Sequence, residues 1–156
     1  MKFIAAIAIL ATSAAALSIK RQSADGTLKL RYINEYADDG FSLSDNGSCS
    51  SILGSKGINT VGDVNKSVDG VNVYPGGAFP VKEWNSGSCG TCWKVSYDDN
   101  GTVRTIRVVA VDTAQEGFNV AQTAMDVLTD GKAYEKGFVT VTAEQLSADN
   151  CKIGTN

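Results

Sequence analysis

The most informative segment of this chain is Trp84-Asn85-Ser86-Gly87-Ser88-Cys89-Gly90-Thr91-Cys92-Trp93-Lys94-Val95-Ser96-Tyr97. It contains both tryptophans and two of the four cysteines. The first half is rich in Asn, Ser and Gly, which are typical of a tight loop. The second half alternates and predicts a strand that begins near Cys92. The two faces of this strand would carry Cys92, Lys94 and Ser96, and Trp93, Val95 and Tyr97.

The remaining cysteines, Cys49 and Cys151, lie far upstream and far downstream of this stretch. An even number of cysteines in a secreted chain predicts disulfides, and four cysteines allow three connectivities. A local Cys89–Cys92 bond would be typical of a redox-active Cys-x-x-Cys motif. In thioredoxin-like proteins this motif begins a helix, whereas here it leads into a predicted strand. The other two connectivities both close long loops, and each bridge would stabilise the fold by about 3–5 kcal/mol.

The first residues have the pattern of a secretory signal peptide. A short positive start, Met1-Lys2, precedes an apolar run and then small residues, so we expect residues 1–18 to be removed. The dibasic pair Lys20-Arg21 offers further processing to residue 21, which leaves residues 22–156 as one mature domain. The apolar run is shorter than the roughly 20 residues that a membrane span needs. The sequence therefore predicts a secreted, extracellular protein.

Composition excludes several classes of function. The net charge is −3, and an acidic chain is a poor binder of nucleic acid or anionic membranes, which require basic patches. The chain has no histidine, so it cannot form a Ser-His-Asp triad or a histidine-based zinc site. Because the cysteines are expected in disulfides, a cysteine nucleophile is also disfavoured. We expect no cofactor and no metal.

The remaining pattern is mainly β. Alternation predicts strands at residues 27–33 and 137–143, and the apolar run at 105–111 predicts a central strand buried on both faces. Residues 74–77 read as a turn, and Asn100-Gly101 predicts a hairpin. Helical spacing predicts one longer helix that includes Phe118, Ala121, Ala124, Met125 and Leu128. A short helix is expected through Ile52-Leu53.

Asp112 is the best-placed carboxylate, because it directly follows the apolar run. It could bind sugar hydroxyls in a groove, or it could be a turn former that accepts backbone N–H groups, and the sequence favours neither. Asp38 and Asp39 could supply a second carboxylate, whereas Glu116 is expected to be merely exposed. The tyrosines Tyr32, Tyr36 and Tyr74 lie near predicted loops and are candidates for an exposed aromatic platform.

The tryptophans could stack on sugar rings. Beside disulfide cysteines, Trp93 is expected in the core, whereas the sequence does not decide for Trp84. Three glycosylation triplets begin at Asn46, Asn65 and Asn100, all in predicted surface loops. We expect one or none of these three to be fully occupied.

Two long motifs resemble the signature of the cerato-platanin family of secreted fungal proteins. They are Trp84-Asn85-Ser86-x-Ser88-Cys89-Gly90-Thr91-Cys92-Trp93-Lys94 and Val111-Asp112-x-Ala114-x-x-Gly117-Phe118-Asn119-Val120-Ala121-x-x-Ala124-Met125-Asp126-x-Leu128-Thr129. Shorter matches are Tyr32, Tyr36, Gly40, Ser42 and Leu43 near the start and Gly76-Gly77-Ala78 in the middle. The resemblance extends from about Leu28 to Cys151.

The resemblance implies a six-stranded double-psi β-barrel with one or two short helices and disulfides Cys49–Cys89 and Cys92–Cys151. It implies a shallow groove that binds N-acetylglucosamine oligomers or chitin without established hydrolysis. The candidate carbohydrate-binding residues are Asp112, Asn119, Asp38, Tyr36 and Asn85. Members loosen cellulosic material weakly, act as phytotoxins or elicitors of plant defence, and reside in fungal cell walls. Cellulose and a plant receptor are further candidate partners, and we expect a monomer.

The chain departs from the family pattern at two places. Acidic residues that usually follow the early tyrosines stand instead at Asp38 and Asp39, and the hairpin at residues 98–104 is longer than usual. Two hypotheses follow: a non-enzymatic carbohydrate-binding protein, and an expansin-like or endoglucanase-type enzyme. The enzyme would need two carboxylates about 5–10 Å apart across a cleft, and Asp112 alone does not meet that requirement.

Overall fold

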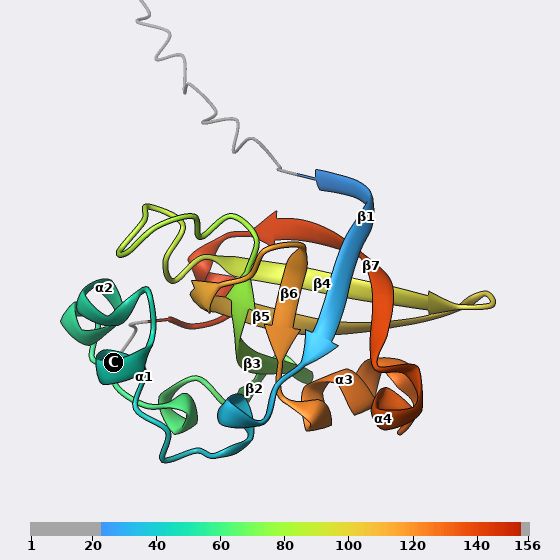
Figure 1. Ribbon diagram of the computed structural model, residues 1–156, viewed down its shortest axis with the longest axis horizontal. Coiled ribbons are helices and arrows are strands. Elements are labelled where there is room, and N and C mark those ends of the chain that lie inside the picture. The colour runs from blue at the N-terminus through green and yellow to red at the C-terminus, as the bar shows by residue number, and fades with distance from the viewer. Residues whose placement is uncertain (1–22, 154–156) are drawn as a thin grey trace, which may run out of the picture.

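The computed structural model describes residues 23–153 as a barrel with short helices at its ends (Figure 1). The strands are β1 (Ser23–Tyr32), β2 (Lys66–Val68), β3 (Val71–Ala78), β4 (Cys92–Asp99), β5 (Thr102–Thr113), β6 (Gly117–Val120) and β7 (Phe138–Leu146). The α-helices are α1 (Leu43–Asn46), α2 (Ser50–Ser55), α3 (Gln122–Thr129) and α4 (Ala133–Lys136). Short 3₁₀ turns lie at Asn34–Ala37, Val61–Asp63 and Ala148–Asn150.

Six of the strands close the barrel in the order β3-β5-β4-β7-β1-β6, and β6 pairs back onto β3. The pairs β1–β6 and β3–β5 are parallel, whereas the other pairs around the barrel are antiparallel. The strand β2 adds a short hairpin outside the ring by pairing with β3. A closed barrel leaves few unpaired strand edges, which stabilises a small mainly β domain. The six-stranded barrel expected from the resemblance is confirmed.

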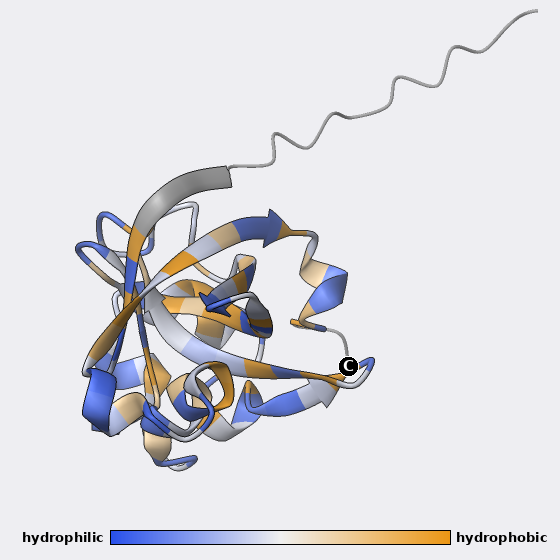
Figure 2. Ribbon diagram, turned by 90° about the vertical axis from the view of Figure 1, so that its right-hand side faces the viewer, coloured by the Kyte–Doolittle hydropathy of each residue, from blue (hydrophilic) through white to orange (hydrophobic). Residues whose placement is uncertain are grey.

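The barrel is filled by apolar side chains from every strand. Residues 108–111 of β5 are completely buried, as the continuous apolar run predicted for a strand covered on both faces. Trp93 is also buried, and its ring packs with those of Phe79 and Phe118 at centroid distances of 5.4–6.0 Å. Figure 2 shows hydrophobic segments on the strands and helix in the middle of the molecule. The prediction that Trp93 belongs to the core is confirmed.

Two disulfides tie distant parts of the chain to β4 and the loop before it. Cys49, at the start of α2, bonds Cys89, and Cys92, at the start of β4, bonds Cys151 near the end of the domain. These are the pairings that the resemblance implied, and the structure has no free cysteine among the residues it describes. These pairings exclude a local Cys89–Cys92 disulfide, and they also exclude the redox interpretation of that motif.

The prediction of a turn at residues 74–77 is wrong, because these residues belong to β3. The glycines are needed there for close packing between strands. A Cβ atom at Gly76 would lie 2.7 Å from the carbonyl oxygen of Asn119, and one at Gly77 would lie 2.5 Å from that of Thr113. Glycine inside a strand often marks such a close approach of another backbone, and here β3 is held between β5 and β6.

The helix predicted from Phe118 onward is only partly correct. Its second half is α3, which begins at Gln122, but Phe118 lies in the strand β6. Phe118 and Val120 point into the core as alternating strand residues, and their spacing to Ala121 and Ala124 only imitates a helical repeat. The structure also has four short α-helices within residues 23–153, rather than one or two.

The expected signal peptide and processing sites lie outside the described residues, so both stay predictions. Over residues 23–153, no helix has the length and apolar character needed to cross a bilayer. Within the same range, no cluster of three or more His, Cys, Asp or Glu residues is arranged to hold a metal ion.

Candidate functional site

A shallow hollow opens at the end of β5, where Asp112 leaves the buried part of that strand. We call it the Tyr36 hollow; it measures about 350 Å³ and is lined by Glu35, Tyr36, Phe41, Leu43, Asn46, Gly47 and Asp112. The segment that follows β1, together with α1 and Gly47 after it, supplies one wall, and the end of β5 supplies the other. Carboxylate and amide groups therefore face the same space as the half-buried ring of Phe41, a mixture that suits a sugar with polar edges and apolar faces.

The Asp112 carboxylate is anchored by the protein itself. Its Oδ1 atom accepts the backbone N–H of Ser48 at 2.9 Å and that of Thr113 at 2.8 Å. Its Oδ2 atom accepts a long hydrogen bond of 3.5 Å from the hydroxyl of Tyr36. Of the two roles that the sequence left open, the turn-forming one is thus present. The hollow still reaches the side chain, so a role in ligand binding stays a prediction.

Tyr36 is not an exposed platform, because only 4% of its surface is accessible. Its ring packs edge-on against Phe41, with centroids 6.5 Å apart, and its hydroxyl points to Asp112. Burial raises the pKa of Tyr36 strongly, and the nearby charges of Asp112 and Glu35 raise it further. The hydroxyl therefore keeps its proton as a hydrogen-bond donor. The sequence could not reveal this burial, because it depends on the Asn34–Ala37 turn folding onto the barrel.

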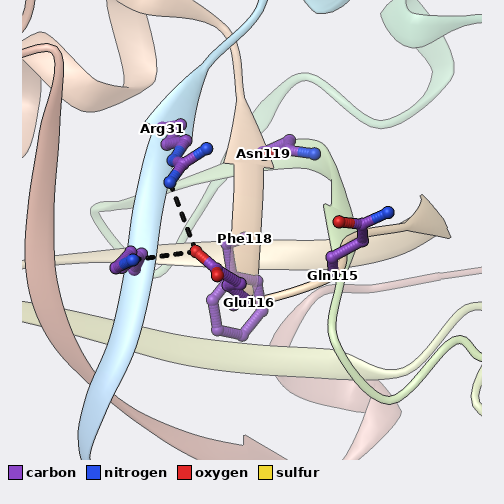
Figure 3. Close-up of a pocket in the computed structure, with 7 residues that line it drawn as sticks. Arg31, Gln115, Glu116, Phe118 and Asn119 are labelled. Carbon is purple, nitrogen blue, oxygen red and sulfur yellow. Dashed lines mark hydrogen bonds and ion pairs between the residues drawn. The ribbon is translucent and has the colours of Figure 1, made fainter.

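A second hollow lies on the neighbouring strands β1 and β6. We call it the Arg31 hollow; it measures about 230 Å³ and is lined by Lys29, Arg31, Gln115, Glu116, Gly117, Phe118 and Asn119 (Figure 3). Glu116 bonds Lys29 at 2.9 Å and Arg31 at 3.2 Å. The hydrogen bond and charge of Lys29, together with the charge of Arg31, hold the pKa of Glu116 below its usual value. Glu116 is exposed, as expected, and it also forms ion pairs with Lys29 and Arg31.

The Asn119 amide, like the exposed amide of Gln115, is an available polar group of the Arg31 hollow. In Figure 3 it lies apart from the Glu116 ion pairs. Among the residues that the structure describes, no protein group forms a hydrogen bond with this amide. An amide both donates and accepts hydrogen bonds, so Asn119 has the chemistry to meet a hydroxyl or an acetamido group.

Gly77, near the end of β3, lies between the strands that carry the two candidate residues. Gly77 pairs with Asp112 of β5 on one side and with Asn119 of β6 on the other. Because neighbouring strands lie about 4.8 Å apart, the backbones of Asp112 and Asn119 are separated by roughly 10 Å. The structure therefore brings these two candidate residues onto strands that flank one position, but each lines its own hollow.

The other candidate residues lie outside both hollows. Asp38 is exposed and accepts the backbone N–H of Gly40 at 2.9 Å. The Oδ1 atom of Asn85 accepts backbone N–H groups of Ser51 and Ile52, so it caps the start of α2. Trp84, which the sequence left undecided, is 62% exposed. Carbohydrate binding by Asp38 and Asn85 stays a prediction.

The sequence interpretation missed two residues of the Tyr36 hollow, Glu35 and Asn46, as potential ligand contacts. Glu35 precedes Tyr36 directly, but nothing in its surroundings distinguished it from an ordinary exposed glutamate. Asn46 was noted only as a glycosylation candidate. Their placement beside Asp112 depends on contacts between residues more than sixty positions apart in the chain.

Comparison with known proteins gives one consistent result. The family model described as Cerato-platanin matches residues 28–153. A heat-stable 19 kDa antigen of Coccidioides immitis is 37% identical over 163 residues, covering 97% of this chain and 98% of that protein. The crystal structure of cerato-platanin 3 from M. perniciosa aligns with a TM-score of 0.72 at 35% identity, covering 81% of this chain and 99% of that one. The solution structure of the fungal elicitor Cerato-Platanin aligns with a TM-score of 0.63 at 29% identity, covering 83% and 100%.

Proposed function

Because this chain belongs to the cerato-platanin family, we propose that it is a secreted, non-hydrolytic protein that binds N-acetylglucosamine oligomers or chitin. Binding would occur at the surface that carries Asp112 and Asn119. The observation that carries the proposal is their placement on the two strands that flank Gly77, roughly 10 Å apart by strand spacing. A ligand that touches both residues must extend over both hollows, so an oligomer suits the surface better than a single sugar.

The groups in the two hollows support this ligand class. The Tyr36 hollow offers the carboxylates of Glu35 and Asp112 and the amide of Asn46, and the Arg31 hollow offers the amides of Asn119 and Gln115. Hydroxyl and acetamido groups need both donors and acceptors, and these side chains provide both. Phe41 adds apolar surface in the Tyr36 hollow, which suits the less polar face of a sugar ring.

The proposed biological role is that of a wall-associated fungal protein that plants can detect. One similar solved protein is described as a fungal elicitor, and that description supports extending an elicitor role to this chain. Phytotoxicity, weak loosening of cellulosic walls and recognition by a plant receptor belong to the same proposal. Infiltration of purified protein into leaves, compared with a heat- and reductant-inactivated sample, would test the elicitor role.

Calorimetric titration with a chitin hexamer tests the binding proposal. Asn119→Ala should weaken binding by about three- to tenfold, which corresponds to the roughly 1 kcal/mol that one hydrogen bond contributes. The matched control is Asn72→Ala, since Asn72 is an exposed asparagine at the other end of β3. The control should bind as the wild type does. No measurable binding by the wild type, or equal affinities of all three proteins, would refute the proposal.

One observation favours the alternative, a polysaccharide-hydrolysing enzyme. Glu35 and Asp112 line the same hollow, and glycoside hydrolysis uses a pair of carboxylates. Against this, Asp112 already accepts three hydrogen bonds and is held in place as an acceptor. Reducing-sugar release from chitin and cellulose distinguishes the two functions. Release by the wild type that is lost in Glu35→Gln would establish the enzyme, whereas binding without release supports our proposal.

A further inference from the structure

The chain contains three Asn-x-Ser/Thr triplets, and the structure places their asparagines in very different surroundings. N-glycosylation attaches the sugar to the side-chain nitrogen, so this nitrogen must be accessible and the attached glycan must have room outside the fold. The three asparagines Asn46, Asn65 and Asn100 can therefore be separated by their contacts.

Asn65 is half-buried, and both ends of its amide are constrained. Its Nδ2 atom donates a hydrogen bond of 2.6 Å to Oδ1 of Asp39, which connects the start of β2 with the loop before α1. Its own Oδ1 atom is buried and has no hydrogen-bond partner. A glycan on Nδ2 would disturb the bond to Asp39 while Oδ1 of the same amide stays buried.

Asn46 is exposed, but it lines the Tyr36 hollow. Its Nδ2 atom donates to the carbonyl oxygen of Ser42 at 3.0 Å. The next two residues are fixed against β5: a Cβ atom at Gly47 would lie 2.9 Å from the carbonyl oxygen of Val111, and the N–H of Ser48 bonds Asp112. A glycan on Asn46 would lie over the hollow.

Asn100 lies at the tip of the β4–β5 hairpin. Its φ of 54° and the φ of 92° at Gly101 are the left-handed values of a two-residue hairpin turn, and Asp99 pairs with Thr102 across it. The turn is fixed independently of the Asn100 side chain, because the N–H of Gly101 bonds Oδ1 of Asp98. Among the described residues, the only hydrogen bond of the exposed Asn100 side chain runs from Nδ2 to Oδ1 of its neighbour Asp99 at 3.2 Å, an oxygen that also accepts from the hydroxyl of Tyr97.

The hairpin also carries Asn100 away from the barrel. The pairing of β4 with β7 ends at Ser96, so the following residues of β4 and the start of β5 form a projecting two-stranded arm. In Figure 1 the tip of this arm and α1, which contains Asn46, lie at opposite ends of the molecule. A glycan at the tip would extend into solvent and leave the Tyr36 hollow open.

We propose that Asn100 is the N-glycosylation site of the secreted protein and that Asn46 and Asn65 remain unmodified. This assignment goes beyond carbohydrate binding, since it concerns a sugar attached to the chain rather than one bound in a hollow. It also gives the longer hairpin of this chain a role, because the arm presents the acceptor away from the barrel wall.

Intact-mass measurement and glycopeptide mapping of protein secreted from a yeast host test the assignment. The decisive variant is Thr102→Ala, which removes the triplet but keeps the Asn100-Gly101 turn, and its matched control is Thr102→Ser, which keeps the triplet. We expect a glycan on the wild type and on Thr102→Ser, at Asn100 only, and none on Thr102→Ala. Asn46→Gln and Asn65→Gln should leave the mass of the glycan unchanged.

Two results would overturn the assignment: a secreted wild type without a glycan, or a glycan that persists in Thr102→Ala. Circular dichroism of each variant shows whether the domain is folded, so that a lost glycan is not mistaken for a failure to fold. The mass measurement does not depend on any bound ligand, so it stands even if the protein does not bind chitin.

Discussion

Replacing Asp112 by asparagine should lower the free energy of unfolding by about 2–3 kcal/mol. The carboxylate accepts two short hydrogen bonds from the N–H groups of Ser48 and Thr113. A hydrogen bond to a charged group contributes about 1.5–3 kcal/mol and a neutral one about 0.5–1.5, so each of these bonds loses roughly 1–1.5 kcal/mol. The 3.5 Å contact with Tyr36 adds little. Ser48 precedes Cys49, so the bond also attaches the α1–α2 segment to the barrel.

Thermal unfolding followed by circular dichroism at pH 7 measures the effect. For a domain of this size, each kcal/mol shifts the melting temperature by roughly 3–5 °C, so we expect a decrease of about 6–15 °C. Asp112→Ala should be less stable still, because the partly buried N–H of Ser48 would have no acceptor. Hydrogen exchange should become faster at the amides of Ser48 and Thr113 in both variants.

Two controls separate this anchoring from other effects of the substitution. Tyr36→Phe removes only the long third bond and should cost less than about 1 kcal/mol. Asp38→Asn removes a charge from an exposed loop and should leave stability within about 0.5 kcal/mol of the wild type. An Asp112→Asn protein that melts like the wild type, with its amide exchange unchanged, would refute the reasoning. Loss of chitin binding in that same stable variant would instead assign the carboxylate to the ligand.

Two further predictions concern the fold. Gly117→Ala should lower the free energy of unfolding by more than about 3 kcal/mol, because the new Cβ would collide with the backbone of Lys29. The control Gly131→Ala has open space around the new Cβ and should cost only about 1–2 kcal/mol, because of its positive φ. Urea denaturation measures both losses, and equal values would contradict the close approach of β1 and β6. Backbone N–H groups of Asn59 and Thr60 hold the pKa of Asp63 below its ordinary value. This carboxylate should therefore stabilise the protein above about pH 4, and the stabilisation should be lost as the pH falls through the pKa of the folded state. Asp63→Asn should therefore be less stable than the wild type at pH 7, by about 1 kcal/mol, and equally stable near pH 2; a difference that persists at acid pH would show that the effect is not ionic.

Features that depend on neighbours along the chain could be predicted from the amino-acid pattern alone. The apolar run at residues 108–111 predicted a strand buried on both faces, and Asn100-Gly101 predicted the hairpin that the structure contains. Alternation from Cys92 predicted β4, and the core position of Trp93 followed from the same stretch. Each of these signals arises from side-chain direction or backbone angles within a few residues, which is why a single sequence displays them.

Contacts between distant strands could not be predicted from these local patterns. The local sequence around Gly76 and Gly77 predicts a turn, but both residues lie in β3, between β5 and β6. Phe118 has helical spacing to later residues, but it lies in β6, which closes the barrel. In the same way, the burial of Tyr36 and the placement of Glu35 and Asn46 beside Asp112 follow from loops folding onto the end of β5. The physical reason is that barrel closure, parallel pairing and hollows between loops are contacts between residues far apart in sequence, and local patterns carry no information about which distant backbone will approach.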